Sequence, residues 1–188
     1  MHILNWGSRL YSVALIVTLA ACSSANKVES NLGLEGVPDW VNKGTQALNN
    51  KDGRLFHGVG MAREMGDMAL QKSTADNRAR TEVALILTSF LKVVGKDYAA
   101  SEKTANITEN VTSVSRQISS MSEVNLPGSR IIASYRDTKK NIIYSLAELD
   151  IKQVNPILDS VKDMNQNLRL YFDENADNIF DRLTKGKR

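Results

Sequence analysis

The chain has 188 residues with 24 basic and 21 acidic side chains, and only 6% of its residues are aromatic. A formal net charge of +3 is close to neutral for this length, which excludes an electrostatic footprint for nucleic acid. The single cysteine excludes a disulfide within the chain. The length suits one domain with a modest core, to which we expect helical additions.

The first 21 residues have the layout of a secretory signal. Arg9 and the initiator amine precede an uncharged stretch from Leu10 to Ala21 that ends in small residues. This apolar run is well short of the ~20 residues that a permanent membrane helix needs. The sequence Leu19-Ala20-Ala21-Cys22 resembles the lipobox of bacterial lipoproteins. We therefore predict cleavage between Ala21 and Cys22 and acylation of Cys22 with chains such as palmitate.

Two other interpretations compete with lipidation. One is an ordinary signal peptide beside a chance cysteine, and the other is a buried helix over residues 10–21. The position of Cys22 disfavours both, because the only cysteine stands at the one place that a lipobox requires. More than one acyl chain gives stable anchoring. Ser23 replaces the aspartate that marks inner-membrane retention, so the resemblance implies the outer membrane, with the domain facing the periplasm.

The next segments predict a tether and then a strand. Residues 22–37 are polar, small and aperiodic, which is typical of a tether. The ordered region is expected to open at Pro38-Asp39-Trp40, with Trp40 as its first large apolar anchor. Alternation over residues 54–62 predicts a strand, and Gly58 and Gly60 leave one face of it nearly bare.

A long helix is predicted over residues 67–94, which contain neither Gly nor Pro. Its apolar stripe, spaced by three and four, consists of Ala75, Ala79, Val83, Ile86, Phe90 and Val93. Gly95 is the expected C-terminal stop. Because the first half of the stripe is alanine, we predict that it packs closely against the bare face of the strand.

The following residues predict a second helix and a hairpin. Residues 97–124 are rich in Ser, Thr and Asn but carry a helical apolar period. Residues 126–128 predict a turn, and residues 131–135 and 142–147 predict two strands around a turn at 137–140. The expected fold class is therefore α+β, a three-stranded antiparallel sheet packed on a long helix, with an extra helix before the hairpin.

The last predicted element is a helix of nearly 30 residues that begins at Asn155-Pro156. Its stripe consists of Ile157, Val161, Met164, Leu168, Phe172, Ala176, Ile179 and Leu183. We do not expect a small domain to cover such a helix throughout. Two interpretations stay open, ordinary core packing and a second half that serves self-association or a partner.

The search for chemistry leaves one candidate residue. His57 is the only histidine after the predicted signal, and a lone strand histidine is more often structural than catalytic. Gly58-Val59-Gly60 lacks the third glycine of a dinucleotide loop. A solvated surface explains the acidic residues Asp173, Glu174, Asp177 and Asp181 and the basic end Lys185, Lys187 and Arg188. We predict a protein that is not an enzyme, without cofactor, metal, small-molecule substrate or nucleic-acid partner.

Four short motifs carry a family resemblance through their order. They are Pro38-Asp39-Trp40-Val41, Gly58-Val59-Gly60 with Ala62, Ala75 with Ala79-Arg80 and Ala84, and Tyr144-Ser145-Leu146-Ala147 with Leu149-Asp150. Over roughly residues 38–150 the chain resembles the LPP-twenty family of small outer-membrane lipoproteins. The resemblance implies a dodecin-like unit, a curved sheet wrapped around a long helix, and no catalytic residues. The family includes FlgP-type lipoproteins, which form rings around the flagellar motor, and surface antigens.

The predicted organisation is a lipoprotein signal peptide (1–21), a tether (22–37), an LPP-twenty-like domain (38–150) and a C-terminal helical extension (151–188). The extension and the Ser/Thr-rich stretch 98–124 depart from short members of the family. The leading hypothesis is an outer-membrane-anchored structural subunit that oligomerises or scaffolds an envelope assembly, such as one at the flagellum. The alternative is a monomeric binding module that regulates an envelope enzyme or recognises peptidoglycan.

Overall fold

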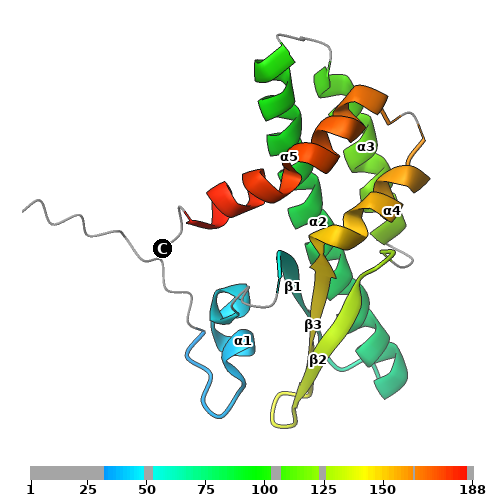
Figure 1. The fold of residues 1–188 in the computed structure, drawn as a ribbon. Coiled ribbons are helices and arrows are strands. Elements are labelled where there is room, and N and C mark those ends of the chain that lie inside the picture. The colour runs from blue at the N-terminus through cyan, green and yellow to red at the C-terminus, as the bar shows by residue number, and fades with distance from the viewer. Residues whose placement is uncertain (1–31, 49–52, 103–106, 123–125, 163, 186–188) are drawn as a thin grey trace, which may run out of the picture.

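The computed structural model shows a three-stranded antiparallel sheet with packed helices (Figure 1). It describes residues 32–48, 53–102, 107–122, 126–162 and 164–185. The elements are α1 (Asp39–Asn42), η1 (Gly44–Ala47), β1 (Leu55–Ala62), α2 (Met68–Glu102), α3 (Ile107–Ser122), β2 (Arg130–Asp137), β3 (Ile142–Asp150), η2 (Ile151–Gln153), α4 (Val154–Ser160) and α5 (Gln166–Lys185). The predicted α+β class is confirmed, including the helix before the hairpin.

The sheet has the order β1-β3-β2, so β3 lies between two antiparallel neighbours. The predicted hairpin joins β2 to β3, and both strands are longer than expected. Its turn is held by Asp137, whose Oδ1 accepts hydrogen bonds from the backbone N–H groups of Lys139 and Lys140. Asn141 closes the turn at φ 53°, in the left-handed region that Asn tolerates better than most residues.

The predicted contact between the bare strand face and the alanine half of the helix is confirmed. A Cβ placed on Gly60 would stand 2.3 Å from the backbone nitrogen of Ala79 and 2.4 Å from the carbonyl oxygen of Ala75. A Cβ on Gly58 would stand 2.4 Å from the carbonyl oxygen of Ala79. Only glycine leaves room for backbone to approach backbone this closely. The pairing of β1 with α2 is therefore set by the size of these residues.

Helix α2 does not stop at Gly95, as predicted, but continues to Glu102. The glycine serves a helix crossing, because a Cβ on it would lie 2.5 Å from Cγ2 of Val111 in α3. The predicted stripe also fails near this point, since Val93 is exposed while Leu91 and Val94 are buried. Beyond the sheet, α2 buries the face that meets α3 and α5.

The predicted single C-terminal helix is wrong, because the chain breaks after Ser160 into α4 and α5. Val161 is extended with ψ 124°, and Asn165 accepts a hydrogen bond from the backbone of Leu168, as an N-cap residue does. Asn155 does not cap the first helix; it lies inside α4, which follows the N-cap Gln153.

The break folds α5 back across α2 and against the start of β1, so its apolar stripe is covered by the rest of the fold (Figure 1). The ring centroids of Phe172 and Phe90 are 6.2 Å apart, and those of Phe180 and Phe56 are 5.3 Å apart. Within the predicted stripe, Leu183 is the member left exposed, at 43%. Since one core joins α4 and α5 to β1, β3 and α2, the stripe is not a free surface for a partner.

Part of the predicted tether is ordered against α1. The backbone N–H of Leu32 donates to the carbonyl oxygen of Asn42, and the N–H of Leu34 donates to its side-chain oxygen, both at 3.1 Å. The buried anchor of this segment is Val41, at 3% exposure, whereas Trp40 is half-buried. The predicted signal and residues 22–31 lie outside the described residues. No helix in the described ranges is long and apolar enough to cross a membrane.

Candidate functional site

The predicted cleavage and lipidation residues, Ala21 and Cys22, lie outside the described residues, as do residues 186–188 of the basic C-terminal end. The described part of the chain offers three features for a functional site. They are a buried polar network around His57, the outer edge of β2, and the end of the molecule that carries the β2–β3 turn. The first and the third bring together residues that are distant in sequence, and the second is a single strand.

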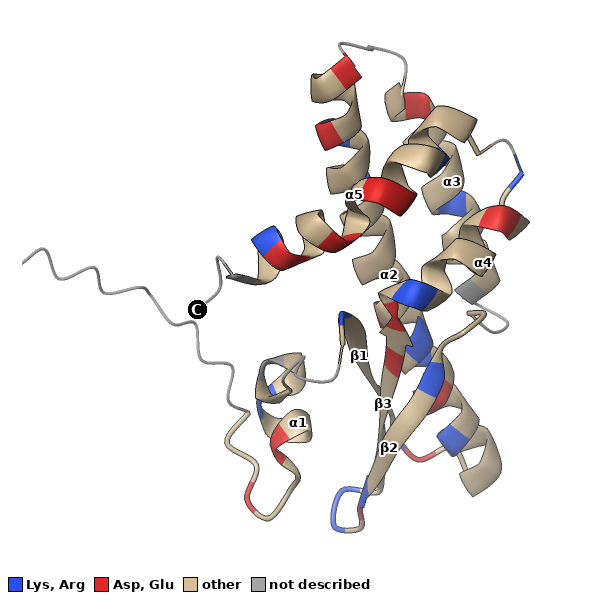
Figure 2. Ribbon diagram, viewed as in Figure 1, with Lys and Arg blue, Asp and Glu red and all other residues tan. Residues whose placement is uncertain are grey.

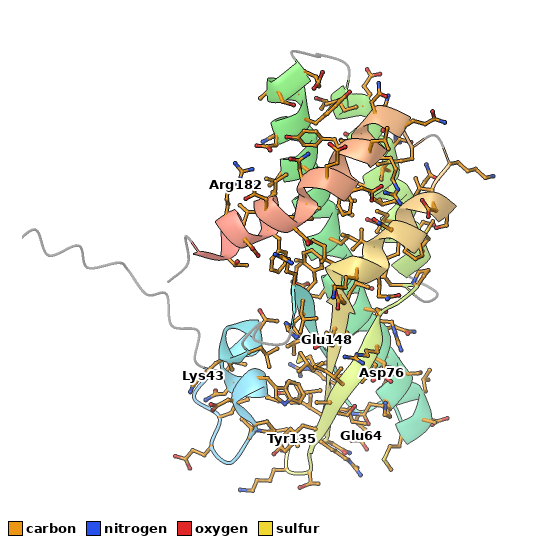
Figure 3. All side chains as sticks on the ribbon, viewed as in Figure 1. Lys43, Glu64, Asp76, Tyr135, Glu148 and Arg182 are labelled. Carbon is orange, nitrogen blue, oxygen red and sulfur yellow. The ribbon has the colours of Figure 1, made fainter. Side chains whose placement is uncertain are left out.

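The His57 network (His57, Arg130 and Glu148) lies on the sheet face opposite α2, because neighbouring residues of a strand point to opposite faces. Register brings the three together, since Glu148 of β3 pairs with His57 of β1 and with Arg130 of β2. His57 Nε2 lies 3.1 Å from Glu148 Oε2, and Arg130 donates two hydrogen bonds to Oε1 at 3.1 and 2.7 Å. Figure 3 labels Glu148 on the sheet.

Two opposed effects act on the pKa of Glu148. Burial raises it, but the hydrogen bonds and charges of Arg130 and His57 lower it, and the net pKa lies below the ordinary value. The carboxylate therefore stays ionised and ties all three strands together. With His57 only 8% and Glu148 only 7% exposed, this geometry favours a structural role for the one histidine that sequence analysis singled out.

Three of the four acidic residues of α5 pair with arginines. Arg54, before β1, donates to both carboxylate oxygens of Asp181 at 2.8 and 2.9 Å and to Asp177 at 3.0 Å. Asp173 pairs with Arg169 on its own helix. No group of three or more metal-ligating residues occurs within the described residues. Asp177 and Asp181 therefore help to dock α5.

The edge of β2 is the second feature. In the order β1-β3-β2 this strand pairs with β3 on one side, and no other described strand pairs with its outer side. A bulge between Ile131 and Ala133 interrupts the register, and Ile132 between them is 42% exposed. An edge of this kind is a template for a strand of another chain.

The third feature, which we name the hairpin end, comprises residues 61–72 and 136–141. Gln71 joins these segments, because its Nε2 donates to the carbonyl oxygens of Ala62 at 3.0 Å and Asn141 at 2.8 Å. Arg136 adds a second link, because its Nη1 donates to Sδ of Met68 at 3.6 Å, while its Nη2 donates to the side-chain oxygen of Asn141 within the turn at 2.8 Å. The two loops are thereby held side by side at one end of the sheet.

A groove of about 440 Å³ opens in the hairpin end between the start of α2 and β2. Its lining residues are Met68, Ala69, Lys72, Ser134, Tyr135, Arg136 and Ile143. Two of them, Lys72 and Arg136, are cationic, and the others are apolar apart from Ser134 and the hydroxyl of Tyr135. Lys72 is paired with Asp76 at 2.7 Å, so the groove combines this ion pair and the guanidinium of Arg136 with apolar side chains.

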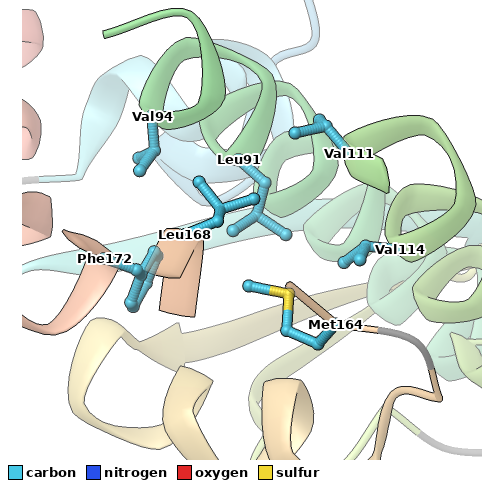
Figure 4. Close-up of a pocket in the computed structure, with 7 residues that line it drawn as sticks. All are labelled: Leu91, Val94, Val111, Val114, Met164, Leu168 and Phe172. Atoms are coloured by element: carbon cyan, nitrogen blue, oxygen red, sulfur yellow. The ribbon is translucent and has the colours of Figure 1, made fainter. Parts of the chain in front are cut away.

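An internal cavity of about 10 Å³ lies where α2, α3 and α5 meet (Figure 4). Its lining residues are Leu91, Val94, Val111, Val114, Met164, Leu168 and Phe172. At this volume and with a fully apolar lining it is a packing gap, too small for a ligand and without partners for a water.

Sequence analysis missed Arg130, Glu148 and the hairpin end. The two charged residues were not recognisable because their meeting depends on strand register. The hairpin end had a local signal, since Met61, Met65 and Met68 are half of the chain's six methionines. Methionine clusters are typical of adaptable binding surfaces.

Comparison with known proteins adds no relative. No protein-family model matches the chain, and no curated protein matches it. The resemblance to the LPP-twenty family therefore remains a prediction from four motifs.

Proposed function

We propose that this chain is a bacterial lipoprotein that is acylated on Cys22, held at the outer membrane and active as a structural subunit of an envelope assembly. The observation that carries the anchoring is the sequence Leu19-Ala20-Ala21-Cys22, which places the chain's only cysteine at the end of a short apolar run. Acyl chains provide the anchor, with several giving stable attachment.

Two properties of the folded domain support a structural role. The buried carboxylate of Glu148 is held by His57 and by Arg130, whose side chain is largely exposed, so the His57 network joins the three strands. The edge of β2 presents backbone groups and the half-exposed Ile132 to a partner. Assembly by strand addition at this edge replaces the earlier idea that the C-terminal stripe makes the contacts, because that stripe is buried.

Acylation is tested by mass spectrometry of the N-terminal peptide of the protein purified from bacterial membranes. The expected result is a peptide that begins at Cys22 and carries the mass of a diacylglycerol and a further acyl chain. A Cys22→Ala variant should leave this product unformed. An unmodified Cys22, or a mature chain that begins elsewhere, contradicts the proposal.

Assembly is tested by a photo-crosslinking amino acid at Ile132 of the full chain in cells. Leu170 of α5, 61% exposed, is the matched control on a surface that the proposal does not use. We expect discrete cross-linked products from position 132 and not from position 170. Products containing two copies indicate an oligomer, and products with another envelope protein indicate a scaffold, of which a flagellar component is one form.

The alternative function is a monomeric module that binds peptidoglycan or regulates an envelope enzyme. It predicts that the full chain cosediments with purified sacculi, or cross-links to one enzyme, while remaining a monomer by size. Absence of cross-links from position 132 together with retention on sacculi would replace the assembly proposal with this one.

A further inference from the structure

We infer that the hairpin end of the molecule rests on an anionic phospholipid surface. Residues 61–72 and 136–141 would present their apolar tips to the bilayer interface and their cations to the lipid head groups. The inference rests on the proposed acylation of Cys22, which tethers the domain to that membrane.

Exposed apolar side chains are concentrated at this end. In the described part of the chain, ten large hydrophobic side chains are exposed, and four of them fall within residues 61–70. Their exposed fractions are 41% for Met61, 46% for Met65, 56% for Met68 and 50% for Leu70. Exposed apolar side chains gathered in one short segment favour an interaction surface. Methionine is flexible and adapts to a disordered interface as readily as to a protein.

The surrounding charge selects an anionic surface. The hairpin end carries the cationic residues Arg63, Lys72, Arg136, Lys139 and Lys140 and the acidic residues Glu64, Asp67 and Asp137. Figure 2 shows the β2–β3 turn as a basic tip that projects from the sheet. Clustered Lys and Arg near a bilayer bind anionic head groups.

Two of these three carboxylates are already engaged in local hydrogen bonds. Asp67 accepts from the N–H groups of Ala69 and Leu70 at the start of α2, and Asp137 accepts from the backbone of the turn. Each accepts through Oδ1 and keeps its negative charge, whereas Lys139 and Lys140 are exposed. Although Lys72 is paired with Asp76 at 2.7 Å, the remaining cations leave this end with a net positive charge.

The groove of the hairpin end fits the same partner. Its lining combines Arg136 and Lys72, the latter also paired with Asp76, with the apolar side chains of Met68 and Ile143. A phosphate group with the first carbons of its glycerol matches this combination of charge and apolar surface. Figure 3 places Tyr135, which also lines the groove, at the same end as Glu64 and far from Arg182 of α5.

Chain geometry allows the contact. The segment between Cys22 and the first described residue, Leu32, spans residues 22–31 and reaches at most ~3.5 Å per residue. Leu32 itself is hydrogen-bonded to α1, which lies on the half of the molecule that carries the β2–β3 turn (Figure 1). The anchor thus joins the domain on the side of the hairpin end.

The test uses the full acylated protein in vesicles and one introduced cysteine. Because Cys22 is modified under the proposed function, the thiol of a Met65→Cys variant is the only one that reacts with a bimane label. A Leu170→Cys variant is the matched control, since Leu170 is also exposed but lies on α5. The vesicles contain phosphatidylcholine with phosphatidylglycerol and a nitroxide on some head groups, and the readout is quenching of bimane fluorescence.

We expect the label at position 65 to be quenched about threefold more than the label at 170, with the difference falling as salt rises. Adding Lys139→Gln and Lys140→Gln to the Met65→Cys variant should reduce its quenching toward that of position 170. The control pair Lys152→Gln and Lys162→Gln, exposed and outside the hairpin end, should leave it unchanged.

Equal quenching at positions 65 and 170, in vesicles that retain the protein, overturns the inference and leaves the anchor intact. Quenching at position 65 that stays the same after Lys139→Gln and Lys140→Gln also overturns the inference. Protection of the label that grows with protein density rather than with phosphatidylglycerol assigns the surface to a second copy. Bimane labelling of the parent protein would show a free Cys22 and contradict the proposed function itself.

Discussion

Gly60 of β1 lies so close to Ala79 of α2 that no side-chain atom fits between them, with 2.3 Å from an ideal Cβ to the Ala79 nitrogen. The atom that a new side chain would meet belongs to the backbone, which cannot move aside by changing rotamer as a side chain can. We therefore predict that Gly60→Ala lowers the free energy of unfolding by about 3 kcal/mol or more, as overpacking against backbone does. Denaturant unfolding followed by circular dichroism measures the change. Ser134→Ala, on an exposed strand position, is the control and should stay within about 0.5 kcal/mol.

The second prediction concerns the crossing of α2 and α3. A Cβ on Gly95 meets a side-chain methyl of Val111 rather than backbone. Gly95→Ala should therefore cost about 1–2 kcal/mol, and shortening its neighbour should relieve the clash. In a double-mutant cycle we expect Gly95→Ala combined with Val111→Ala to be less destabilising than the sum of the two single changes. Additive effects would show that the helices do not touch at this point.

The third prediction is a pH dependence that comes from Glu148. Its pKa in the folded protein is lower than the ordinary value of 4.5. A lowered folded pKa contributes stability that is present above the unfolded pKa and is lost as the pH falls through the folded pKa. Glu148→Gln should therefore destabilise the protein by about 2 kcal/mol at pH 7.

The difference between Glu148→Gln and the parent should shrink as the pH falls below 4.5, where the unfolded parent takes up its proton, and should vanish below the lowered folded pKa. Urea unfolding across a pH series measures it. Glu64→Gln, at an exposed position, is the matched control and should follow the parent at every pH. A constant gap between Glu148→Gln and the parent would show that the charge of Glu148 is not the source of the stability.

The fourth prediction is that the C-terminal helices cannot be removed without loss of the fold. A chain that ends at Asp150 loses Phe172, Ile179 and Phe180, which are buried in the same core as Phe56. We expect it to bind a hydrophobic dye and to unfold without a cooperative transition. A chain that ends at Lys185 is the control and should melt like the parent. Cooperative unfolding of the shorter chain would instead show an independent domain at 38–150.

The parts of the fold that sequence reasoning predicted depend on local patterns. Alternation marked β1, the glycines and alanines marked the face where β1 meets α2, and the Asp137 turn marked the hairpin. The wrong predictions are those that depend on tertiary contacts. Gly95 has the local signature of a helix stop, but in the fold it admits Val111. The break after Ser160 contains neither Gly nor Pro, so nothing in its composition interrupts the predicted helix.

The candidate functional residues likewise fall into those that local sequence reveals and those that only the fold brings together. Cys22 is recognisable because a lipobox is contiguous, and the methionines of the hairpin end are close in sequence. The His57 network could not be predicted from the sequence, because the contacts of Arg130 and Glu148 with His57 depend on two strand registers. The sequence does predict that His57 lies in a strand; what it lacks is the carboxylate that faces it.

The ion pair between Arg54 and Asp181 joins positions 127 residues apart, and beside it β1 packs under α5. The residues that pack against β1 are therefore not all present until nearly the whole chain is available. Closing so large a loop early is costly in chain entropy, and contacts of this separation slow folding. Under the export that we propose, this slow completion of the core would favour an unfolded chain while its N-terminus crosses the membrane.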